Sequence, residues 1–226
     1  MKRCLVVGAA GCGREVLSWA LHMKQQDWHI EGFLDADPLA LEGTDFPYRV
    51  LGDPAGWTPA GDEVFIAGLG DPETRMRVCL GLKERGAEFV TVLHPTVVLA
   101  LNVTIGEGCV LAPNVVVSAN ARLGKFILVN IAASIGHDSD TGDGSTVSCH
   151  CDVMGHVKIG RGCFLGSHAS VLPGKRVGDG AIVGAGSAVT RHVAERTTVL
   201  GVPAQVLMPS RPEKSPADIL LGIKNG

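Results

Sequence analysis

Hydrophobic residues in the second half of the chain recur every six positions. From Leu93 to Ala194 the sequence divides into seventeen hexads without an insertion, and the first position is Leu, Ile or Val except at Thr141. The fifth position is usually small, as at Cys109, Ala121, Ala133, Ser139, Ser145, Cys151, Cys163, Ala169, Ala181 and Ser187. An α-helix would repeat every 3.6 residues and an amphipathic strand every two. A period of six predicts a parallel β-helix, a coil of short strands with a corner every six residues.

The first 92 residues follow a different pattern, in which short apolar runs alternate with helical segments. We expect strands at Cys4–Val7, Ile30–Leu34, Val64–Ala67 and Phe89–Leu93, and helices at Arg14–Lys24 and from Pro72 onward. Such alternation indicates a parallel sheet with helices. The predicted organisation is an α/β Rossmann-like domain over residues 1–92, an all-β parallel β-helix over 93–207 and a tail over 208–226. Within the tail, residues 212–216 are expected to be flexible and 217–224 to form a short helix.

Composition supports this division and excludes several classes of protein. Eight of the ten aromatic residues precede position 93, and only Phe126 and Phe164 follow it. A hydrophobic content of 46% excludes disorder, and no window approaches the 18 uncharged apolar residues of a membrane span. The net charge of −3 gives no general attraction to nucleic acid.

Cysteine usage and the N-terminal sequence favour the cytoplasm. The apolar run Cys4–Val7 is too short for the core of a signal peptide. The seven cysteines are an odd number, without an even disulfide framework. Those at fifth positions of hexads are expected to be packing residues, and Cys12 and Cys149 to be exposed. No covalent intermediate on cysteine is expected.

A glycine-rich loop follows the first strand in the pattern GxxGxG. Glycines between a strand and a helix let backbone N–H groups approach a phosphate at the helix N-terminus. An acidic side chain 22 residues after Gly13 is placed to meet a ribose hydroxyl. Substrate contacts are therefore predicted at Gly8, Ala10, Gly11, Cys12, Gly13, Asp35, Asp37 and Gly68. A tight turn without a ligand is the alternative. A domain of this length supplies one half of a dinucleotide fold, which suits the nucleoside diphosphate of a nucleotide-linked sugar.

The order of these motifs resembles a known family. The hexads look like the left-handed β-helix of hexapeptide acyltransferases, although right-handed crossovers dominate parallel connections in general. Together with GxxGxG, Phe33-Leu34-Asp35 and Gly201-Val202-Pro203-Ala204, they resemble bacterial nucleotide-sugar N-acetyltransferases of bacillosamine and perosamine synthesis over residues 3–207. Sialic acid O-acetyltransferases are close relatives. The resemblance implies three hexads per coil, so that residues 18 apart stack, and a homotrimer with sites at the subunit seams. The N-terminal domain is expected to cap one end of the β-helix, and Gly201–Ala204 with the tail the other.

The resemblance also implies the catalytic residues. His137 matches the family's catalytic histidine, and a near-neutral imidazole suits a general base. Asp138 would orient the ring, which requires a corner because neighbours on a straight strand point to opposite faces. Gly155, one coil beyond His137, would offer its N–H to the oxyanion, and Asn130 matches an asparagine near the sugar. The structural alternatives are a surface histidine, a corner glycine and a turn-capping amide.

Acetyl-CoA is the implied cosubstrate, and no metal is expected. Its contacts are predicted at Thr146, Gly155, Ser167, Ala185, Gly201 and Pro203, although family members carry a histidine where this chain has Thr146. His150, His156 and His168 are expected to line the trough between subunits, with His150 and His168 stacked. Carbonic anhydrases of the same fold bind zinc through histidines five apart, a spacing this chain lacks.

The predicted activity is therefore acetyl transfer from acetyl-CoA to an amine, at C4, of a UDP-, dTDP- or GDP-linked amino-deoxysugar by direct attack. A sialic acid O-acetyltransferase is the first alternative and would accept a free sugar. A dinucleotide-binding oxidoreductase and a non-enzymatic β-helix scaffold are more distant alternatives.

Overall fold

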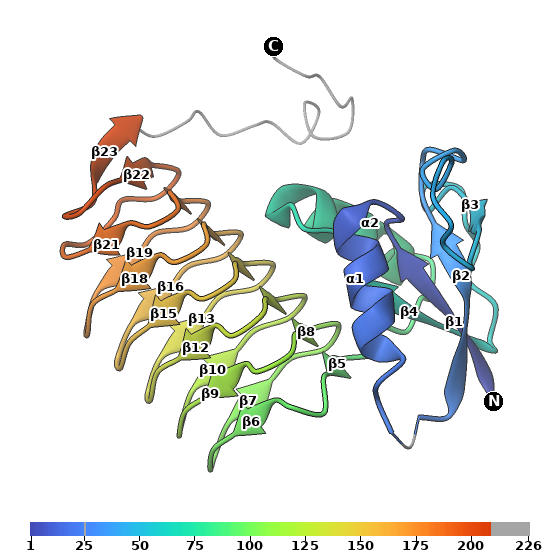
Figure 1. Cartoon of the computed structure of the whole chain (residues 1–226), viewed down its shortest axis with the longest axis horizontal. Helices are drawn as coiled ribbons and strands as arrows, with labels where there is room; N and C mark the ends of the chain where they lie inside the picture. Colours follow the sequence, from blue (N-terminus) through green and yellow to red (C-terminus); the bar gives the residue numbers. More distant parts are fainter. Residues whose placement is uncertain (25, 209–226) are drawn as a thin grey trace.

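An α/β unit lies beside a left-handed β-helix in the computed structural model, which describes residues 1–24 and 26–208 (Figure 1). The expectations for 209–226, including the flexible stretch and the short helix, lie outside the described residues. In the part of the chain that is described, no helix has the length and apolar character needed to cross a membrane.

The N-terminal unit is a four-stranded parallel sheet with two helices. Its elements are β1 (Lys2–Val7), α1 (Gly11–Ala20), β2 (Trp28–Leu34), β3 (Val50–Gly52), β4 (Glu63–Ala67) and α2 (Pro72–Glu84). The strand order is β3-β2-β1-β4, so the chain starts in the middle, extends to one side and then crosses to the other. This is the topology of a Rossmann-type half and confirms the predicted α/β class.

Three details differ from the sequence prediction. Helix α1 begins at Gly11, inside the glycine loop, and ends at Ala20, where His22 N–H bonds the Trp19 carbonyl and tightens the last turn. Strand β3 is an additional edge strand. Phe89 makes only an isolated bridge to Phe65, because the chain leaves the sheet there to enter the β-helix.

The β-helix consists of three parallel sheets that wind around one axis. The β7 sheet contains β7 (Thr104–Ile105), β10 (Arg122–Leu123), β13 (Asp140–Thr141), β16 (Lys158–Ile159) and β19 (Arg176–Val177). The β8 sheet contains β5 (Val92–Leu93), β8 (Val110–Leu111), β11 (Leu128–Val129), β14 (Thr146–Val147), β17 (Phe164–Leu165), β20 (Ile182–Val183), β22 (Thr198–Leu200) and β23 (Gln205–Met208). The β6 sheet contains β6 (Val98–Leu99), β9 (Val116–Val117), β12 (Ser134–Ile135), β15 (Asp152–Val153), β18 (Ser170–Val171) and β21 (Ala188–Val189). Partners such as Leu111, Val129 and Val147 are 18 residues apart, as the hexads predict.

Each coil turns at three corners, and each corner residue has a left-handed backbone. The first corner contains Asn102, Asn120, Asp138, His156 and Gly174. The second corner contains Asn114, Ala132, His150, His168 and Gly186. The third corner contains Gly108, Phe126, Gly144, Gly162 and Gly180. Their φ angles lie between +53° and +70°, a region that glycine, asparagine and aspartate enter most readily.

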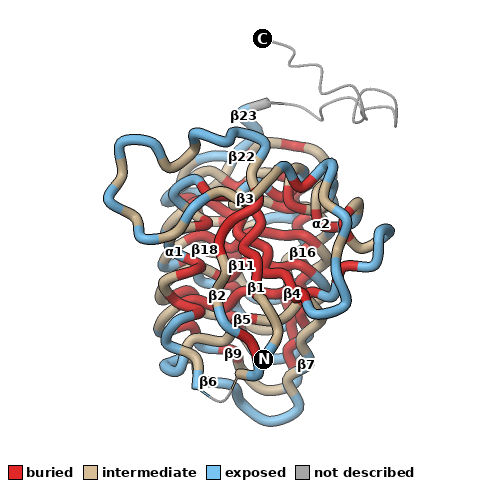
Figure 2. Tube along the Cα trace, turned by 90° about the vertical axis from the view of Figure 1, so that its right-hand side faces the viewer, coloured by how far each residue is buried: buried red, intermediate tan, exposed pale blue. Residues whose placement is uncertain are grey.

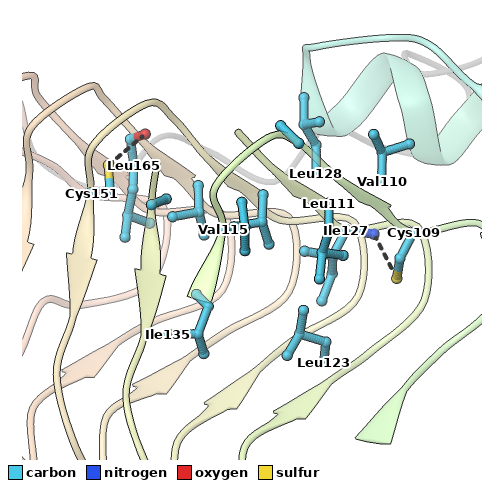
Figure 3. Packing of buried hydrophobic residues seen from close by; sticks show 14 of the residues in the cluster. Cys109, Val110, Leu111, Val115, Leu123, Ile127, Leu128, Ile135, Cys151 and Leu165 are labelled. Carbon is cyan, nitrogen blue, oxygen red and sulfur yellow. Dashed lines mark hydrogen bonds between the residues drawn. The ribbon is translucent and has the colours of Figure 1, made fainter. Parts of the chain in front are cut away.

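The β-helix interior is filled as the hexads predict. Every first-position residue from Leu111 to Val189 is buried, and so are all ten small fifth-position residues. Figure 3 shows this packing, including the bond from Ile127 N–H to Cys109 Sγ at 3.4 Å. Burial raises the pKa of the Cys109, Cys151 and Cys163 thiols to about 11. These cysteines are therefore packing residues, and all seven thiols are free.

The N-terminal unit packs on the side of the first coils. Buried residues of both parts meet without a break (red in Figure 2), and one hydrophobic cluster contains Val6 and Ile66 together with Leu111. Helix α2 lies against the third corner, where a Cβ on Gly144 would overlap Met76. The first coil stays open, with Val98 57% and Leu101 81% exposed. The domain thus covers one side of the first coils, and the expectation that it caps their end is wrong.

A hairpin lies at the other end of the β-helix. Strand β23 pairs antiparallel with β22, and Gly201–Ala204 forms the turn between them, with a cis peptide before Pro203. Ala188 N–H bonds the Gly201 carbonyl, and Ala204 N–H bonds the Ala188 carbonyl. The predicted segment therefore lies at this end, and the tail that was expected to complete the closure lies outside the described residues.

Candidate active site

The glycine loop and the loop after β4 meet at the carboxyl ends of β1 and β4. The strand order reverses between these two strands, which is where open α/β sheets bind ligands. Gly8 has φ of +100°, and a Cβ on Gly13 would overlap the Gly8 carbonyl oxygen. A Cβ on Gly68 would lie 3.0 Å from the Gly13 Cα. The three glycines therefore allow the two loops to touch at this edge of the sheet, which is termed the crevice here because folds of this topology bind ligands there.

The N-terminus of α1 opens at this crevice. Its N-cap, Ala10, supplies no side-chain acceptor, and both Ala10 and Gly11 are exposed. The first N–H groups of a helix have no partner within the helix, so they favour an anion. Cys12 is half-buried, and burial raises the pKa of its thiol to about 11. The predicted phosphate contacts at Gly8–Gly13 are thus gathered in one place.

The two aspartates are bound to backbone groups beside this loop. Asp35 accepts hydrogen bonds from Ala9 N–H at 2.7 Å and Asp37 N–H at 3.0 Å. Asp37 accepts one from Leu39 N–H at 2.9 Å. Asp35 thus ties the glycine loop to the end of β2, and its predicted contact with a ribose stays a prediction.

We expect Gly13→Ala to destabilise the N-terminal unit strongly. Overlap with the Gly8 carbonyl forces the tight turn apart, and overpacking costs typically about 1–3 kcal/mol. Thermal unfolding measures the effect. Gly11→Ala is the matched control, because a Cβ there meets nothing within 4 Å and should leave the melting temperature nearly unchanged. Equal melting temperatures for the two variants would contradict the crowding at Gly13.

A histidine–aspartate pair stands at the first corner of the β-helix. Strand β12 leads into Gly136, and the left-handed corner at Asp138 turns its side chain back toward His137. His137 Nδ1 lies 2.8 Å from Asp138 Oδ2, and the two side chains are 58% and 39% exposed. The turn at Asp138 is the corner that the predicted pairing of His137 with Asp138 required. The hydrogen bond assigns the proton to Nδ1 and leaves Nε2 as the basic nitrogen.

Gly155 lies directly beside this basic nitrogen, one coil on. A Cβ on Gly155 would lie 2.5 Å from His137 Nε2 and 2.7 Å from Cε1. Any larger residue would displace the imidazole. The sequence analysis gave two possible roles for Gly155, a donor to the oxyanion or a corner glycine. The structure adds a third reason, because only glycine leaves room for the His137 ring.

A ladder of asparagines supports Asp138 from the preceding coils. Asn120 Nδ2 donates to Asp138 Oδ1 at 3.0 Å, and Asn102 Nδ2 donates to Asn120 Oδ1 at 3.2 Å. Both oxygens of Asp138 are therefore occupied, with Oδ2 directed at His137. The hydrogen bonds from His137 and Asn120 lower the pKa of the Asp138 carboxyl. Sequence reasoning missed Asn120, although the period of 18 places it below Asp138.

His156 completes the group, with its ring edge-on to that of His137 at a centroid distance of 5.0 Å. Donor atoms of His137, Asp138 and His156 lie within 4.8 Å of one another. Zinc accepts such ligands. All three residues are exposed, and Nδ1 of His137 and Oδ2 of Asp138 are already bonded to each other. We retain the expectation that no metal takes part.

The Asp138 pKa predicts a pH-dependent contribution to stability. A carboxyl whose folded-state pKa is depressed stabilises the fold above its unfolded pKa, near 3.9, and loses that contribution as the pH falls through the folded value. The urea-midpoint difference between wild type and Asp138→Asn should therefore change in favour of the variant as the pH falls from about 5 to below about 4. The pKa values of Asp62 and Glu107 are also lowered. Both residues are present in the two proteins, so their contributions to stability cancel in the difference. A difference that stays constant to pH 3 would contradict the prediction.

Except for Gly155, which lies beside His137, the predicted acetyl-CoA contacts lie at other places in the chain. Ser167 and Ala185 immediately precede the second corner, where Gly186 N–H bonds the Ser167 carbonyl at 2.9 Å. Gly201 and Pro203 lie in the hairpin of β22 and β23. His150 and His168 stack at the second corner, with centroids 4.9 Å apart and planes at 9°, as their spacing predicted. One chain therefore does not bring these residues to His137.

Two predicted contacts occupy structural positions. Thr146 is 3% exposed beneath the N-terminal unit, and its hydroxyl donates to the Gly70 carbonyl at 2.8 Å. Its position does not support the predicted contact with the cofactor, because packing of the two domains covers it. Asn130 Oδ1 accepts from Ile131 N–H at 2.7 Å, as a turn-capping amide does, and its contact with sugar stays a prediction.

Known proteins with this combination of domains include nucleotide-sugar acetyltransferases. The PglD N-terminal domain model matches residues 3–81, and the hexapeptide repeat of succinyl-transferase matches residues 156–191. No curated protein matches the chain. PerB from Caulobacter crescentus, solved with CoA and GDP-perosamine, is 26% identical, with a TM-score of 0.81 over 91% of this chain and 97% of PerB.

Two further solved structures share the architecture. WeeI from Acinetobacter baumannii AYE is 28% identical, with a TM-score of 0.79 over 92% of this chain and 100% of WeeI. The acetyltransferase domain of PglB from Neisseria gonorrhoeae FA1090, in complex with acetyl coenzyme A, is 24% identical and shares the fold, with a TM-score of 0.83 over 91% of this chain and 99% of that domain. The predicted resemblance to nucleotide-sugar N-acetyltransferases is confirmed, and with it the predicted enzyme class.

Proposed function

We propose that this protein transfers the acetyl group of acetyl-CoA to the amine of a nucleotide-linked amino sugar, at C4 of the sugar. The observation that carries the proposal is the exposed His137–Asp138 pair with its basic nitrogen beside Gly155. The similarity to PerB, which was solved with CoA and GDP-perosamine, supports the same pair of ligands. We place the reaction in the cytoplasm, where acetyl-CoA is available.

His137 acts as the general base in this proposal. The amine nitrogen attacks the thioester carbonyl carbon while Nε2 of His137 removes its proton. The carbon–sulfur bond then breaks, and the departing thiolate of CoA takes the proton from His137. Asp138 holds the ring in place and stabilises the imidazolium, as its hydrogen bond to Nδ1 allows. The Gly155 N–H is proposed as the donor to the oxyanion, a contribution of about 2.7–4 kcal/mol in comparable sites.

The crevice of the N-terminal unit holds the nucleotide in this proposal. The N–H groups at the start of α1 receive the diphosphate, and Gly68 lets the two loops approach it. Asp35 and Asp37 lie beside the loop, where the ribose or the base would be. UDP, dTDP and GDP are the candidate nucleotides.

The complete site is proposed to form between subunits of a homotrimer. His137 stands at the first corner, whereas Ser167 and Ala185 stand at the second, so a neighbouring chain is needed to bring both kinds of residue together. The β6 sheet between these corners carries exposed apolar side chains at Val98 and Val116, which a neighbour would cover. His150, His156 and His168 would then line the trough that receives acetyl-CoA.

A continuous assay of thiol release from acetyl-CoA tests this function. The substrates are UDP-, dTDP- and GDP-linked 4-amino sugars, and the same sugars without a nucleotide. One nucleotide-linked sugar should be preferred strongly over its free form. Activity on free sialic acid would favour the O-acetyltransferase. A melting-temperature shift with a nicotinamide dinucleotide and none with acetyl-CoA would favour an oxidoreductase, and binding of neither would leave a β-helix scaffold.

A further inference from the structure

A buried arginine joins the two domains behind the crevice. Arg75 lies in the first turn of α2, and it is 1% exposed. Its Nη1 donates to the Leu69 carbonyl at 2.7 Å and the Gly70 carbonyl at 3.1 Å. These two carbonyls belong to the loop that follows β4. The arginine therefore holds one wall of the crevice from inside the protein.

The other side of the same guanidinium is bound to the β-helix. Nε donates to the Phe126 carbonyl at 2.9 Å, and Nη2 donates to the carbonyls of Gly144 at 2.8 Å and Ser145 at 3.0 Å. Nη2 also lies 3.0 Å from Thr146 Oγ1, whose hydroxyl in turn donates to Gly70. Each nitrogen of the planar guanidinium thus has a partner, and the partners come from both domains.

Burying the Arg75 cation without a carboxylate partner costs free energy. Such a cost is tolerated where the position of the loop serves function. A buried cation is normally paired with a carboxylate, because removing a charge from water is unfavourable. Among the described ion pairs none involves Arg75. Desolvation lowers the pKa of the guanidinium, which nevertheless stays charged at neutral pH.

The loop held by Arg75 is in direct contact with the glycine loop. A Cβ on Gly8 would lie 2.7 Å from Leu69 Cδ2, and a Cβ on Gly70 would lie 3.7 Å from Cys12 Sγ. Leu69 and Gly70 therefore stand between Arg75 and the N-terminus of α1. A displacement of this loop would move the crevice relative to the β-helix.

We propose that Arg75 is a positioning residue that fixes the crevice on the β-helix and thereby makes the enzyme selective for amino sugars carried on a nucleotide. The proposal rests on the proposed function. A nucleotide-linked sugar is held in the crevice and must reach a histidine on the β-helix, so its productive binding depends on the offset between the two domains. A free sugar does not occupy the crevice, and its slow reaction does not depend on that offset.

The test compares Arg75→Met and Arg75→Lys with the wild-type enzyme. Methionine keeps an unbranched chain without donors, and lysine keeps the charge but cannot reproduce the planar fork. The control is Arg85→Met at the end of the same helix, because within the described part of the chain the Arg85 guanidinium donates to the Trp57 and Pro54 carbonyls of its own domain. We measure kcat and KM for the nucleotide-linked sugar, the free sugar and acetyl-CoA, with the melting temperature of each variant.

Arg75→Met should raise KM for the nucleotide-linked sugar at least about tenfold, with KM for acetyl-CoA and the rate on free sugar changed less than about twofold. Arg75→Lys should restore part of this loss, and Arg85→Met should behave as wild type. Equal losses on the linked and free sugars, or no loss on either, would overturn the proposal. If Arg75→Met does not fold, the same comparison with Arg75→Lys decides.

A binding measurement separates this inference from the proposed reaction. Calorimetric titration with UDP, dTDP and GDP, and with the amino sugars linked to them, does not require catalysis. In the absence of acetyl-CoA, affinity for the nucleotide-linked amino sugar should be at least about tenfold weaker in Arg75→Met than in wild type, whereas affinity for the nucleoside diphosphate alone should change less than about twofold. Equal losses for the two ligands, or no loss for either, would overturn the positioning role even where no transfer is detected. A wild-type protein that binds no nucleoside diphosphate would overturn both this inference and the nucleotide site.

Discussion

His137→Ala is expected to lower kcat for acetyl transfer by about 10²–10⁴-fold, the usual contribution of a general base. Only the ring nitrogen opposite the Asp138 bond is free to accept the proton of the attacking amine. KM for acetyl-CoA should change little, because the predicted contacts of the cofactor other than Gly155 lie away from His137. Steady-state kinetics with the preferred sugar measure both quantities.

His29→Ala is the matched control for this variant. His29 is an exposed histidine on β2 whose ring faces Glu31 at 3.3 Å, so it repeats the pairing of a histidine with a carboxylate away from the β-helix. It should retain wild-type kcat. Full activity of His137→Ala would remove the general base from the mechanism and with it the assigned role of Asp138.

Gly155→Ala should lower kcat by about 10²-fold, as a misplacement of about 1 Å in a reacting group can do. The added methyl group would lie 2.5 Å from His137 Nε2, so the imidazole must move away from the position it now holds. The alanine retains the backbone N–H. A glycine needed only as an oxyanion donor would therefore tolerate this change.

A double-variant cycle identifies the cause of that loss. If Gly155→Ala acts through the imidazole, it should cost nothing further in a protein that already carries His137→Ala. Additive losses would show that Gly155 acts independently of His137. Unchanged kcat in the single variant would contradict the crowding at this corner.

The repeat made much of the candidate site predictable. The period of six located the hexads, and the family resemblance implied three hexads per coil, so residues 18 apart could be placed above one another. Gly155 beside His137 and the stacked rings of His150 and His168 follow directly from that spacing. The interior positions followed as well, because a narrow coil admits only aliphatic and small residues.

Contacts between the domains were not predictable in this way. Arg75 lies in the first turn of a helix, where a charged residue ordinarily faces water, and no sequence period relates it to Gly144 or Thr146. The burial of Thr146 depends on the same docking. The left hand of the β-helix was implied by the family resemblance, because the general preference for right-handed crossovers indicates the opposite hand. The catalytic role of His137 was likewise implied by the resemblance.

Mass spectrometry of the sugar product tests the central claim most directly. The protein is incubated with acetyl-CoA and each nucleotide-linked 4-amino sugar, and the products are fragmented to locate the modification. We predict the gain of one acetyl group on the amine nitrogen of one nucleotide-linked sugar, with stoichiometric release of CoA and no product from His137→Ala. An acetyl group found on a hydroxyl oxygen, or an unmodified nucleotide-linked amine in every case, would contradict the account.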